Sequence, residues 1–390
     1  MVNLRSFEVP TVVKHAPGAL ECLPDQVKSL GVKRPMLVTD QGLVKAGLVE
    51  RITDTLKAGA VDYVLFDGVV ANPPIKLVDD AAVLYKAEKC DGLIGFGGGS
   101  PMDTAKAIGV VVENGGSILN YEWADPQPIQ KRIPPLITVP TTAGTGSEVT
   151  LWSVITDPKR HIKYNVGGTG LIAAYVALID PLLMLDMPAH ITSSTGLDAL
   201  THAIECYTCA YAQPWPDAVA LWAIETLAQW LPIAFAQGHN VEARYKVAMA
   251  AMLAGMSYGT ESAGAVHAMS QTAGGYYDLP HGVLTAAMLP PVMAYNYLGE
   301  PAKYARIAQA MGVNTWGMTM FEAAEAAVDA VTTFVETLEI PSLAELGVKE
   351  ADIPMLVDLA YNDPQTVGNP RDLTRKSYEQ IYRSCFPKSG

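Results

Sequence analysis

The sequence predicts an α/β domain built on a parallel sheet, followed by an all-helical domain. Up to about Pro181, short runs rich in β-branched residues alternate with helical segments, as in "PMLVTD", "DGLIGFGGGS" and "PPLITVPTT". This alternation is typical of βαβ units, whose strands pair in parallel. After Pro188 the chain changes to long alanine- and leucine-rich stretches with helical periodicity, such as "DAVALWAIETLAQWL". We therefore expect the first domain over residues 1–184 and the helical domain over residues 185–390.

The composition is that of a compact protein with a large buried core. The chain has 390 residues, of which 49% are hydrophobic and 17% are charged, so it is long enough for two domains and too apolar to be disordered. Its formal net charge of −13 opposes the phosphate neutralisation that nucleic-acid binding requires. We expect no nucleic-acid partner.

The sequence also predicts a cytoplasmic protein with no membrane partner. The N-terminal residues "MVNLRSFEVPTVVKH" contain no apolar run of signal-peptide length. The most membrane-like run, Ala218 to Ala236, carries Glu225 and Gln229 one helical turn apart, which favours a buried core helix over a membrane span. The five cysteines are an odd number spread along the chain, and this favours reduced thiols over a disulfide framework.

A glycine-rich turn within "DGLIGFGGGSPMDTAKAIG" is a candidate phosphate-binding loop. We expect a strand ending at Phe96, then a helix with Ser100 as N-cap, Pro101 at its first position and Asp103 in its first turn. Backbone N–H groups at such a helix start can hold a phosphate, although glycine serves an ordinary tight turn equally well. Three consecutive glycines exceed what a turn needs, which favours close approach by a ligand.

Two neighbouring segments extend this candidate cofactor site. The turn lacks the G-x-G-x-x-G dinucleotide fingerprint, because Ser100 stands in place of the third glycine. Asp40 ends the earlier strand "PMLVTD", where its carboxylate either hydrogen-bonds a ribose 2′-OH or caps the next helix. The loop "TVPTTAGTGSEVT" follows another strand and offers the hydroxyls of Thr141, Thr142 and Thr145. Ligands of open α/β sheets bind at the carboxyl edge of the strands, where these loops are expected.

Four side chains of the second half are candidate metal ligands. Asp198 and His202 are four residues apart on an expected helix, so both lie on one face, although an i,i+4 Asp–His hydrogen bond is also common. His267 on a helix and His281 in a Pro-His-Gly turn complete a set of one carboxylate and three imidazoles. Such a set suits Zn²⁺ or Fe²⁺ and is a poor match for Mg²⁺ or Ca²⁺.

These motifs together resemble the iron-containing (group III) alcohol dehydrogenases, a family related to glycerol dehydrogenase and dehydroquinate synthase. The resemblance covers nearly the whole chain and rests on "DGVVANPP", "GFGGGSPMDTAKAIG", "VPTTAGTGSEVT", "STGLDALTHAIECY", "VHAMSQTAGGYYDLPHG" and "GNPR", which occur in the family's order and at its spacing. It implies a Rossmann-like N-terminal domain that binds NAD and a helical metal-binding, catalytic domain, as in the dehydroquinate synthase-like architecture.

The resemblance also implies an activity and a set of residues. The family's reaction is reversible hydride transfer between a small primary alcohol and NAD, with one divalent metal ion, for which we expect iron over zinc; we also expect a homo-oligomer. Residue by residue, the metal ligands match Asp198, His202, His267 and His281. The cofactor positions match Asp40, Asn72, Gly98, Gly99, Ser100, Asp103, Thr141, Thr142 and Lys163.

The chain departs from the family's pattern at positions expected near the substrate. Gln271 replaces the second histidine of the family's H-A-x-x-H, and its amide cannot titrate as a proton-relay group does. Trp152 with Tyr258 would narrow a pocket for a short aldehyde, whereas Glu261 or Gln365 would select a polar substrate.

Two other functions fit the sequence less well. A lyase like dehydroquinate synthase, which uses NAD as a recycled oxidant, needs a phosphate-binding lysine and arginine cluster that we do not find in the helical half. A catalytically impaired binding protein is consistent with Gln271 alone, but the intact metal ligands and cofactor loops oppose it.

Overall fold

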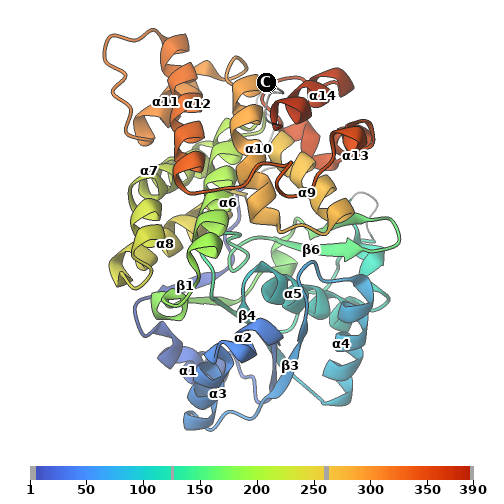
Figure 1. The fold of residues 1–390 in the computed structure, drawn as a ribbon. Helices are drawn as coiled ribbons and strands as arrows, with labels where there is room; N and C mark the ends of the chain where they lie inside the picture. Colours follow the sequence, from blue (N-terminus) through green and yellow to red (C-terminus); the bar gives the residue numbers. More distant parts are fainter. Residues whose placement is uncertain (1–5, 124–126, 259–262, 387–390) are drawn as a thin grey trace. The chain divides into compact units, whose positions relative to one another are not determined.

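The computed structural model describes residues 6–123, 127–258 and 263–386. The chain divides into two compact units, Met1–Asp186 and Met187–Gly390 (Figure 1). The division lies two residues beyond the boundary expected after residue 184, where the strands give way to helices.

A parallel sheet of six strands forms the centre of the first unit (Figure 1). Its strands run in the order β1-β8-β5-β4-β2-β3, and all neighbours pair in parallel. This confirms the α/β prediction. The strands are β1 (Val12–His15), β2 (Pro35–Asp40), β3 (Val64–Val69), β4 (Gly92–Gly97), β5 (Leu136–Pro140) and β8 (Val176–Ile179).

Helices cover both faces of this sheet, because its strands are apolar on both sides. In β2, Met36 and Val38 pack into one core cluster with residues of α4 and α5, whereas Leu37 packs into a second cluster with residues of α1 and α3. The helices of the unit are η1 (Ala19–Cys22), α1 (Leu23–Ser29), α2 (Gln41–Lys45), α3 (Leu48–Ala58), α4 (Ile75–Ala87), α5 (Gly99–Asn114), η2 (Ile118–Tyr121), η3 (Gly170–Ile172) and η4 (Pro181–Met184).

The first unit also contains an antiparallel hairpin that the βαβ pattern did not predict. It pairs β6 (Trp152–Asp157) with β7 (Ile162–Gly167). Its signal in the sequence is the alternation in "WSVITD" and "IKYNVG" on either side of the polar turn "PKRH", a spacing that admits a hairpin and leaves no room for a crossover helix.

The described part of the second unit is entirely helical, which confirms the predicted all-α domain. Helix α6 packs against α7, α8 and α10 (Figure 1). The helices are α6 (Ala189–Thr208), α7 (Pro214–Ala236), α8 (Val241–Tyr258), α9 (Ala265–Tyr277), α10 (His281–Asn296), α11 (Pro301–Ala310), α12 (Met320–Thr337), η5 (Glu350–Asp352), α13 (Ile353–Tyr361), η6 (Pro364–Gly368) and α14 (Arg375–Ser384).

Helix α7 contains the apolar run that by length and composition alone could cross a membrane. One side of α7 packs against α6 and α8, and Ala220, Ile224 and Leu227 on it are fully buried. The structure thus uses this helix to build the core of the unit, as its polar positions predicted.

Two helix starts differ from the sequence-based expectation. Helix α5 begins at Gly99 with Gly98 as its N-cap, because the extended Gly98 already accepts from the Met102 N–H at 3.5 Å, so Ser100 lies inside the helix and is not the cap. His281 does not sit in a turn: it is the first residue of α10, and Pro280 is the N-cap, since the backbone of proline suits the residues that begin a helix.

Candidate metal and cofactor sites

Three helices of the second unit bring the predicted metal ligands together. Helix α6 supplies Asp198 and His202, α9 supplies His267 and α10 supplies His281. The ligand atoms of Asp198, His267 and His281 all lie within 4.8 Å of one another. Nε2 of His281 is 3.7 Å from Oδ1 of Asp198. Residues separated by up to 83 positions in the sequence therefore form one cluster.

His202 lies beside this three-residue cluster without being part of it. Its ring stacks on that of His267, with 4.6 Å between the ring centroids and 25° between the planes. The helical spacing placed it correctly one turn after Asp198 on α6. Its role as a fourth ligand remains a prediction.

A glycine allows the start of α10 to approach α6. A Cβ atom at Gly282 would lie 2.7 Å from the carbonyl oxygen of Ser194 and 3.5 Å from Cβ of Asp198. A larger residue would therefore push the two helices apart. This close approach explains why His281 is followed by glycine.

The carboxyl group of Asp198 is held in its charged form. Burial raises the pKa of Asp198, but the nearby His202, His281 and His267 and the hydrogen bond from Thr285 bring this pKa below its usual value. The Thr285 hydroxyl donates to Oδ1 at 2.9 Å. A buried carboxylate among imidazoles is suited to a cation.

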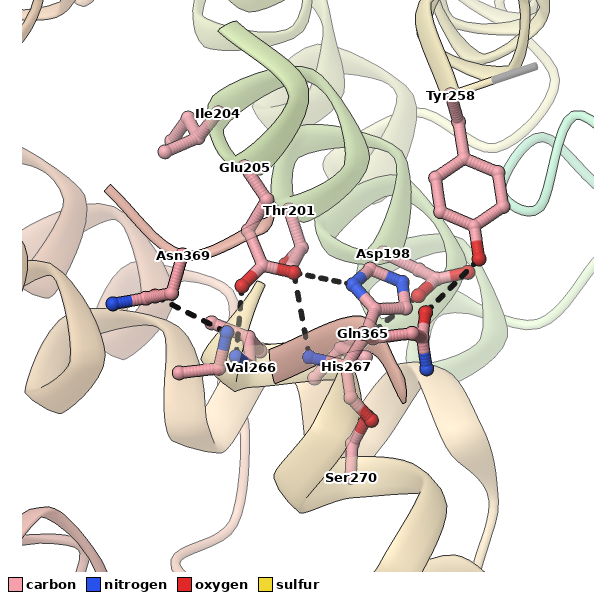
Figure 2. Close-up of polar contacts among 12 residues, drawn as sticks. Asp198, Thr201, Ile204, Glu205, Tyr258, Val266, His267, Ser270, Gln365 and Asn369 are labelled. Carbon is pink, nitrogen blue, oxygen red and sulfur yellow. Dashed lines mark hydrogen bonds and ion pairs between the residues drawn. The ribbon is translucent and has the colours of Figure 1, made fainter. Parts of the chain in front are cut away.

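The fit of a metal ion is supported by an unsatisfied nitrogen. Nε2 of His267 is buried and has no hydrogen-bond partner among the described residues, and buried polar atoms without partners are rare in folded proteins. Its other ring nitrogen, Nδ1, lies 2.5 Å from Oε2 of Glu205 (Figure 2). Burial lowers the pKa of His267, but Glu205 raises it, and the net effect is a raised pKa. The donor set fits a divalent transition metal.

The sequence reasoning missed Glu205. It lies three residues after His202 and seven after Asp198 on α6, so all three share one helix face. The pattern D-x-x-x-H-x-x-E was a usable signal, because ligating histidines usually bond a carboxylate or carbonyl through their second nitrogen.

The residues expected near the substrate are only partly described. Tyr258 ends α8, its ring centroid lies 5.0 Å from that of His202, and its hydroxyl donates to Oε1 of Gln365 at 3.0 Å (Figure 2). Gln271 is buried on α9, one turn after His267. Glu261 lies outside the described residues.

In the first unit, the predicted cofactor loops lie side by side. The Thr141 N–H donates to the Gly97 carbonyl at 2.9 Å. A Cβ atom at Gly98 would lie 3.3 Å from the Thr142 hydroxyl, and one at Gly99 would lie 2.9 Å from Cγ2 of Thr145. The glycines are thus required for the contact between the two loops, whether or not a ligand binds there.

Asp40 occupies the end of β2, and its carboxylate caps the following helix. Oδ1 accepts from the Leu43 N–H at 3.0 Å, so the capping alternative is realised. Strand β2 lies between β3 and β4, where the chain changes its direction across the sheet. Such a switch point is the place at which open α/β sheets bind ligands.

A buried polar cluster joins the loop "TVPTTAGTGSEVT" to α5. The Asp103 carboxylate accepts from the Ser147 hydroxyl at 2.5 Å and from the Val154 N–H at 3.0 Å. The fully buried ammonium of Lys106 donates to the Ser147 hydroxyl and to the Trp152 carbonyl. Asp103 is therefore directed at protein groups.

Of the remaining candidates, Trp152 contacts this cluster through its carbonyl. Trp152 begins β6 and packs edge-on against Trp123, with 5.3 Å between the ring centroids. Lys163 is buried on β7, and Asn72 has a left-handed backbone with φ of 54°. Their contacts with a cofactor remain predictions.

Comparison with known proteins is consistent with this geometry. The sequence model described as "Iron-containing alcohol dehydrogenase" matches residues 10–181, and the one described as "Fe-containing alcohol dehydrogenase family, C-terminal" matches residues 192–386. Together they span both units.

Individual relatives are similar to this chain over nearly its whole length. A choline dehydrogenase of Bacillus subtilis (strain 168) is 54% identical over 99% of this chain and 96% of its own length. An NAD-dependent methanol dehydrogenase of Bacillus methanolicus is 37% identical over 98% of this chain and all of its own. The crystal structure of a 1,3-propanediol oxidoreductase superposes with a TM-score of 0.94 at 38% identity, covering 98% of this chain and all of that one. All three are named as oxidoreductases, and none supports the lyase alternative.

Proposed function

The chain belongs to the iron-containing alcohol dehydrogenase family and is an NAD-linked enzyme that interconverts an alcohol and its aldehyde, and from this premise we propose how its residues divide the work. The observation that carries the proposal is the convergence of three helices on one buried carboxylate and its neighbouring imidazoles. The residues that hold the metal ion are Asp198, His202, His267 and His281.

The first unit is proposed to bind NAD at the carboxyl edge of its sheet. Gly98 and Gly99 present bare backbone at the start of α5, where the helix dipole favours the cofactor's phosphates. Asp40 accepts a hydrogen bond from the ribose. The other cofactor positions are Asn72, Ser100, Thr141, Thr142, Thr145 and Lys163, while Asp103 acts indirectly by holding the loop that contains Ser147.

When bound, the divalent ion supplies Lewis acidity, which eases loss of the alcohol proton. The chain's own residues determine where this proton goes. Gln271 can hold a water molecule or the substrate hydroxyl, but it cannot accept the proton. We propose that the proton leaves through water or the ribose hydroxyls of the cofactor.

For the substrate, we propose a small alcohol that carries a quaternary ammonium group, as choline does. The choline dehydrogenase is 54% identical to this chain. Tyr258 places an aromatic face beside the proposed metal site, and aromatic faces attract quaternary ammonium groups by about 0.5–2 kcal/mol.

The test compares choline with 3,3-dimethylbutan-1-ol, in which carbon replaces the ammonium nitrogen and the shape is retained. Oxidation is followed as NADH formation, with 1,3-propanediol as a second neutral substrate. We expect kcat/KM for choline to exceed that for the neutral isostere by about 2- to 30-fold, the range that cation–π attraction supplies. A higher kcat/KM for either neutral alcohol contradicts the proposed substrate class.

We also propose that the protein works in the cytoplasm as a homo-oligomer. The five cysteines are an odd number spread along the chain, which favours reduced thiols and so a reducing compartment. The side chains of Trp316, Met320 and Phe321 are exposed within one short segment, and clustered exposed apolar groups favour association. Light scattering should give a mass that is a multiple of the 41.6 kDa chain; a single-chain mass at micromolar concentration contradicts the oligomer.

A further inference from the structure

We propose that Glu205 is a positioning residue that selects the metal-binding form of His267. Its carboxylate holds the proton on Nδ1 and leaves the lone pair on Nε2 for the ion. This inference rests on the proposed metal site and adds a residue that is not among the four proposed metal ligands.

The Glu205 carboxylate is buried and lies against three nitrogen atoms at the start of α9, two backbone N–H groups and one ring nitrogen. Oε1 accepts from the Val266 N–H at 2.7 Å, and Oε2 accepts from the His267 N–H at 3.3 Å. Oε2 also lies 2.5 Å from Nδ1 of His267. Figure 2 shows the carboxylate reaching from α6 to these groups. The same oxygens thus fix both the backbone and the ring of His267.

These backbone contacts cap a helix that lacks a cap of its own. Val266 and His267 are the second and third residues of α9, and its N-cap is Gly264, which has no side chain. The first N–H groups of a helix have no partners within it, and a carboxylate there also interacts favourably with the helix dipole. Glu205 supplies that carboxylate from another helix.

Gly264 is required for this arrangement. A Cβ atom at this position would lie 2.9 Å from Oε1 of Glu205 and 3.1 Å from Oδ1 of Asn369. Asn369 completes the cap, because its Oδ1 accepts from the Ala265 N–H at 3.3 Å. Two side chains thus share the start of α9, but only Glu205 contacts the imidazole.

The chemistry of a ligating histidine explains the value of this contact. A neutral imidazole carries its proton on one nitrogen, and the hydrogen bond made by that nitrogen decides which one is left to bind a metal. With Nδ1 bonded to Glu205, Nε2 is the free atom, and Nε2 is the buried nitrogen without a partner among the described residues. Loss of such partners typically weakens metal binding 10- to 100-fold.

The matched pair of variants is Glu205→Gln and Asn369→Ala. Glutamine retains the size of the side chain but has a single acceptor oxygen, so it cannot accept from all three donors at once. Asn369→Ala removes a cap of α9 and leaves the Glu205–His267 contact in place. A purely structural role of Glu205 predicts that both variants weaken metal binding equally.

The measurement is Co²⁺ affinity of the metal-free full-length protein, by competition with a chelator. We expect Glu205→Gln to bind Co²⁺ about 10- to 100-fold more weakly and to change its d–d absorption spectrum, while Asn369→Ala retains the unaltered protein's spectrum and affinity within about threefold. Binding of NADH, followed by fluorescence, should be unchanged in both. Equal Co²⁺ affinity and spectrum in Glu205→Gln and the unaltered protein overturns the proposal.

A measurement of the protonated nitrogen in the unaltered protein does not depend on the folding of Glu205→Gln. The chain has seven histidines, so ¹⁵N-histidine labelling of the Zn²⁺-loaded protein gives a tractable spectrum, with His267 identified by its loss in His267→Ala. We expect a proton on Nδ1 and none on Nε2; a proton on Nε2 overturns the role of Glu205. If His267→Ala retains full metal binding, it is the proposed metal site that fails.

Discussion

Gln271 makes proton transfer the step in which this chain should differ most from its family. General base assistance is worth roughly 10²–10⁴-fold where it operates, and an amide cannot provide it. Alcohol oxidation is therefore expected to be slow near pH 7 and to rise toward alkaline pH, while aldehyde reduction should suffer less.

The substitution Gln271→His tests this expectation. Its imidazole should raise oxidation near neutral pH by up to about 10²-fold, because it can accept the proton that water otherwise removes. The kcat–pH profile of oxidation is measured for both forms, with metal content checked. An unaltered enzyme already at its plateau by pH 7, with no change in the variant, would show that position 271 takes no part in proton transfer.

Asp40 should make NAD preferred to NADP, because its carboxylate repels a 2′-phosphate. Asp40 also caps α2, so Asp40→Asn is the informative variant: it can still accept from the Leu43 N–H and has lost only the charge. We expect its kcat/KM ratio for NAD over NADP to fall toward that of Asp40→Gly. Equal kcat/KM for both cofactors in the unaltered enzyme would remove this role from Asp40.

Glu148 should make stability fall as pH rises toward neutrality. Burial raises the pKa of Glu148 to about 7 from an ordinary value of 4.5, so the folded state binds its proton more tightly than the unfolded state. The resulting stabilisation is present below pH 4.5 and is lost as pH rises through 7, on the order of 3 kcal/mol in all.

Glu148→Gln should remove the part of the pH dependence of stability that comes from Glu148. Thermal unfolding of both proteins is followed between pH 4.5 and 7.5, below the pKa of about 8 to which burial lowers Lys106. A smaller decline of the melting temperature is expected for the variant. Parallel profiles for the two proteins would mean that Glu148 titrates alike in the folded and unfolded states.

At the scale of helices and strands, Gly282 decides how closely α10 approaches α6. Since a Cβ atom there would lie 2.7 Å from a backbone oxygen of α6, Gly282→Ala must displace His281 from Asp198. We expect a lower melting temperature and at least tenfold weaker metal binding. Val283→Ala, at the adjacent half-buried position, is the control and should bind metal normally. Full metal content in Gly282→Ala would show that the helices need not be this close.

Local patterns predicted most elements but not their ends. The alternation of strands and helices gave the parallel sheet, and helical spacing gave α6 with Asp198 and His202 on one face. The cap of α5 was placed at Ser100 because serine is a good N-cap, whereas the structure uses Gly98. The hairpin β6–β7 was missed because its strands interrupt an otherwise regular βαβ rhythm.

At the scale of the whole chain, the sequence predicted some contacts between distant segments and missed others. The gathering of Asp198, His267 and His281 followed from motifs in their family order. The spacing on α6 places Glu205 on the same helix face as the ligands, but the histidine that it contacts depends on how α6 packs against the start of α9. The proposed substrate pocket likewise combines side chains far apart in sequence: the Tyr258 hydroxyl donates to Gln365, 107 positions later.

Metal analysis tests the central claim, that one buried cluster of the helical unit holds the ion on which this dehydrogenase depends. The unaltered protein and its His267→Ala and His281→Ala variants are purified without oxygen, and iron and zinc are counted per chain alongside NADH formation. The account predicts one divalent ion per chain in the unaltered protein, and loss of both metal and turnover in the variants, because the remaining donors form an incomplete shell. A His267→Ala protein that retains one ion per chain and full turnover would contradict it.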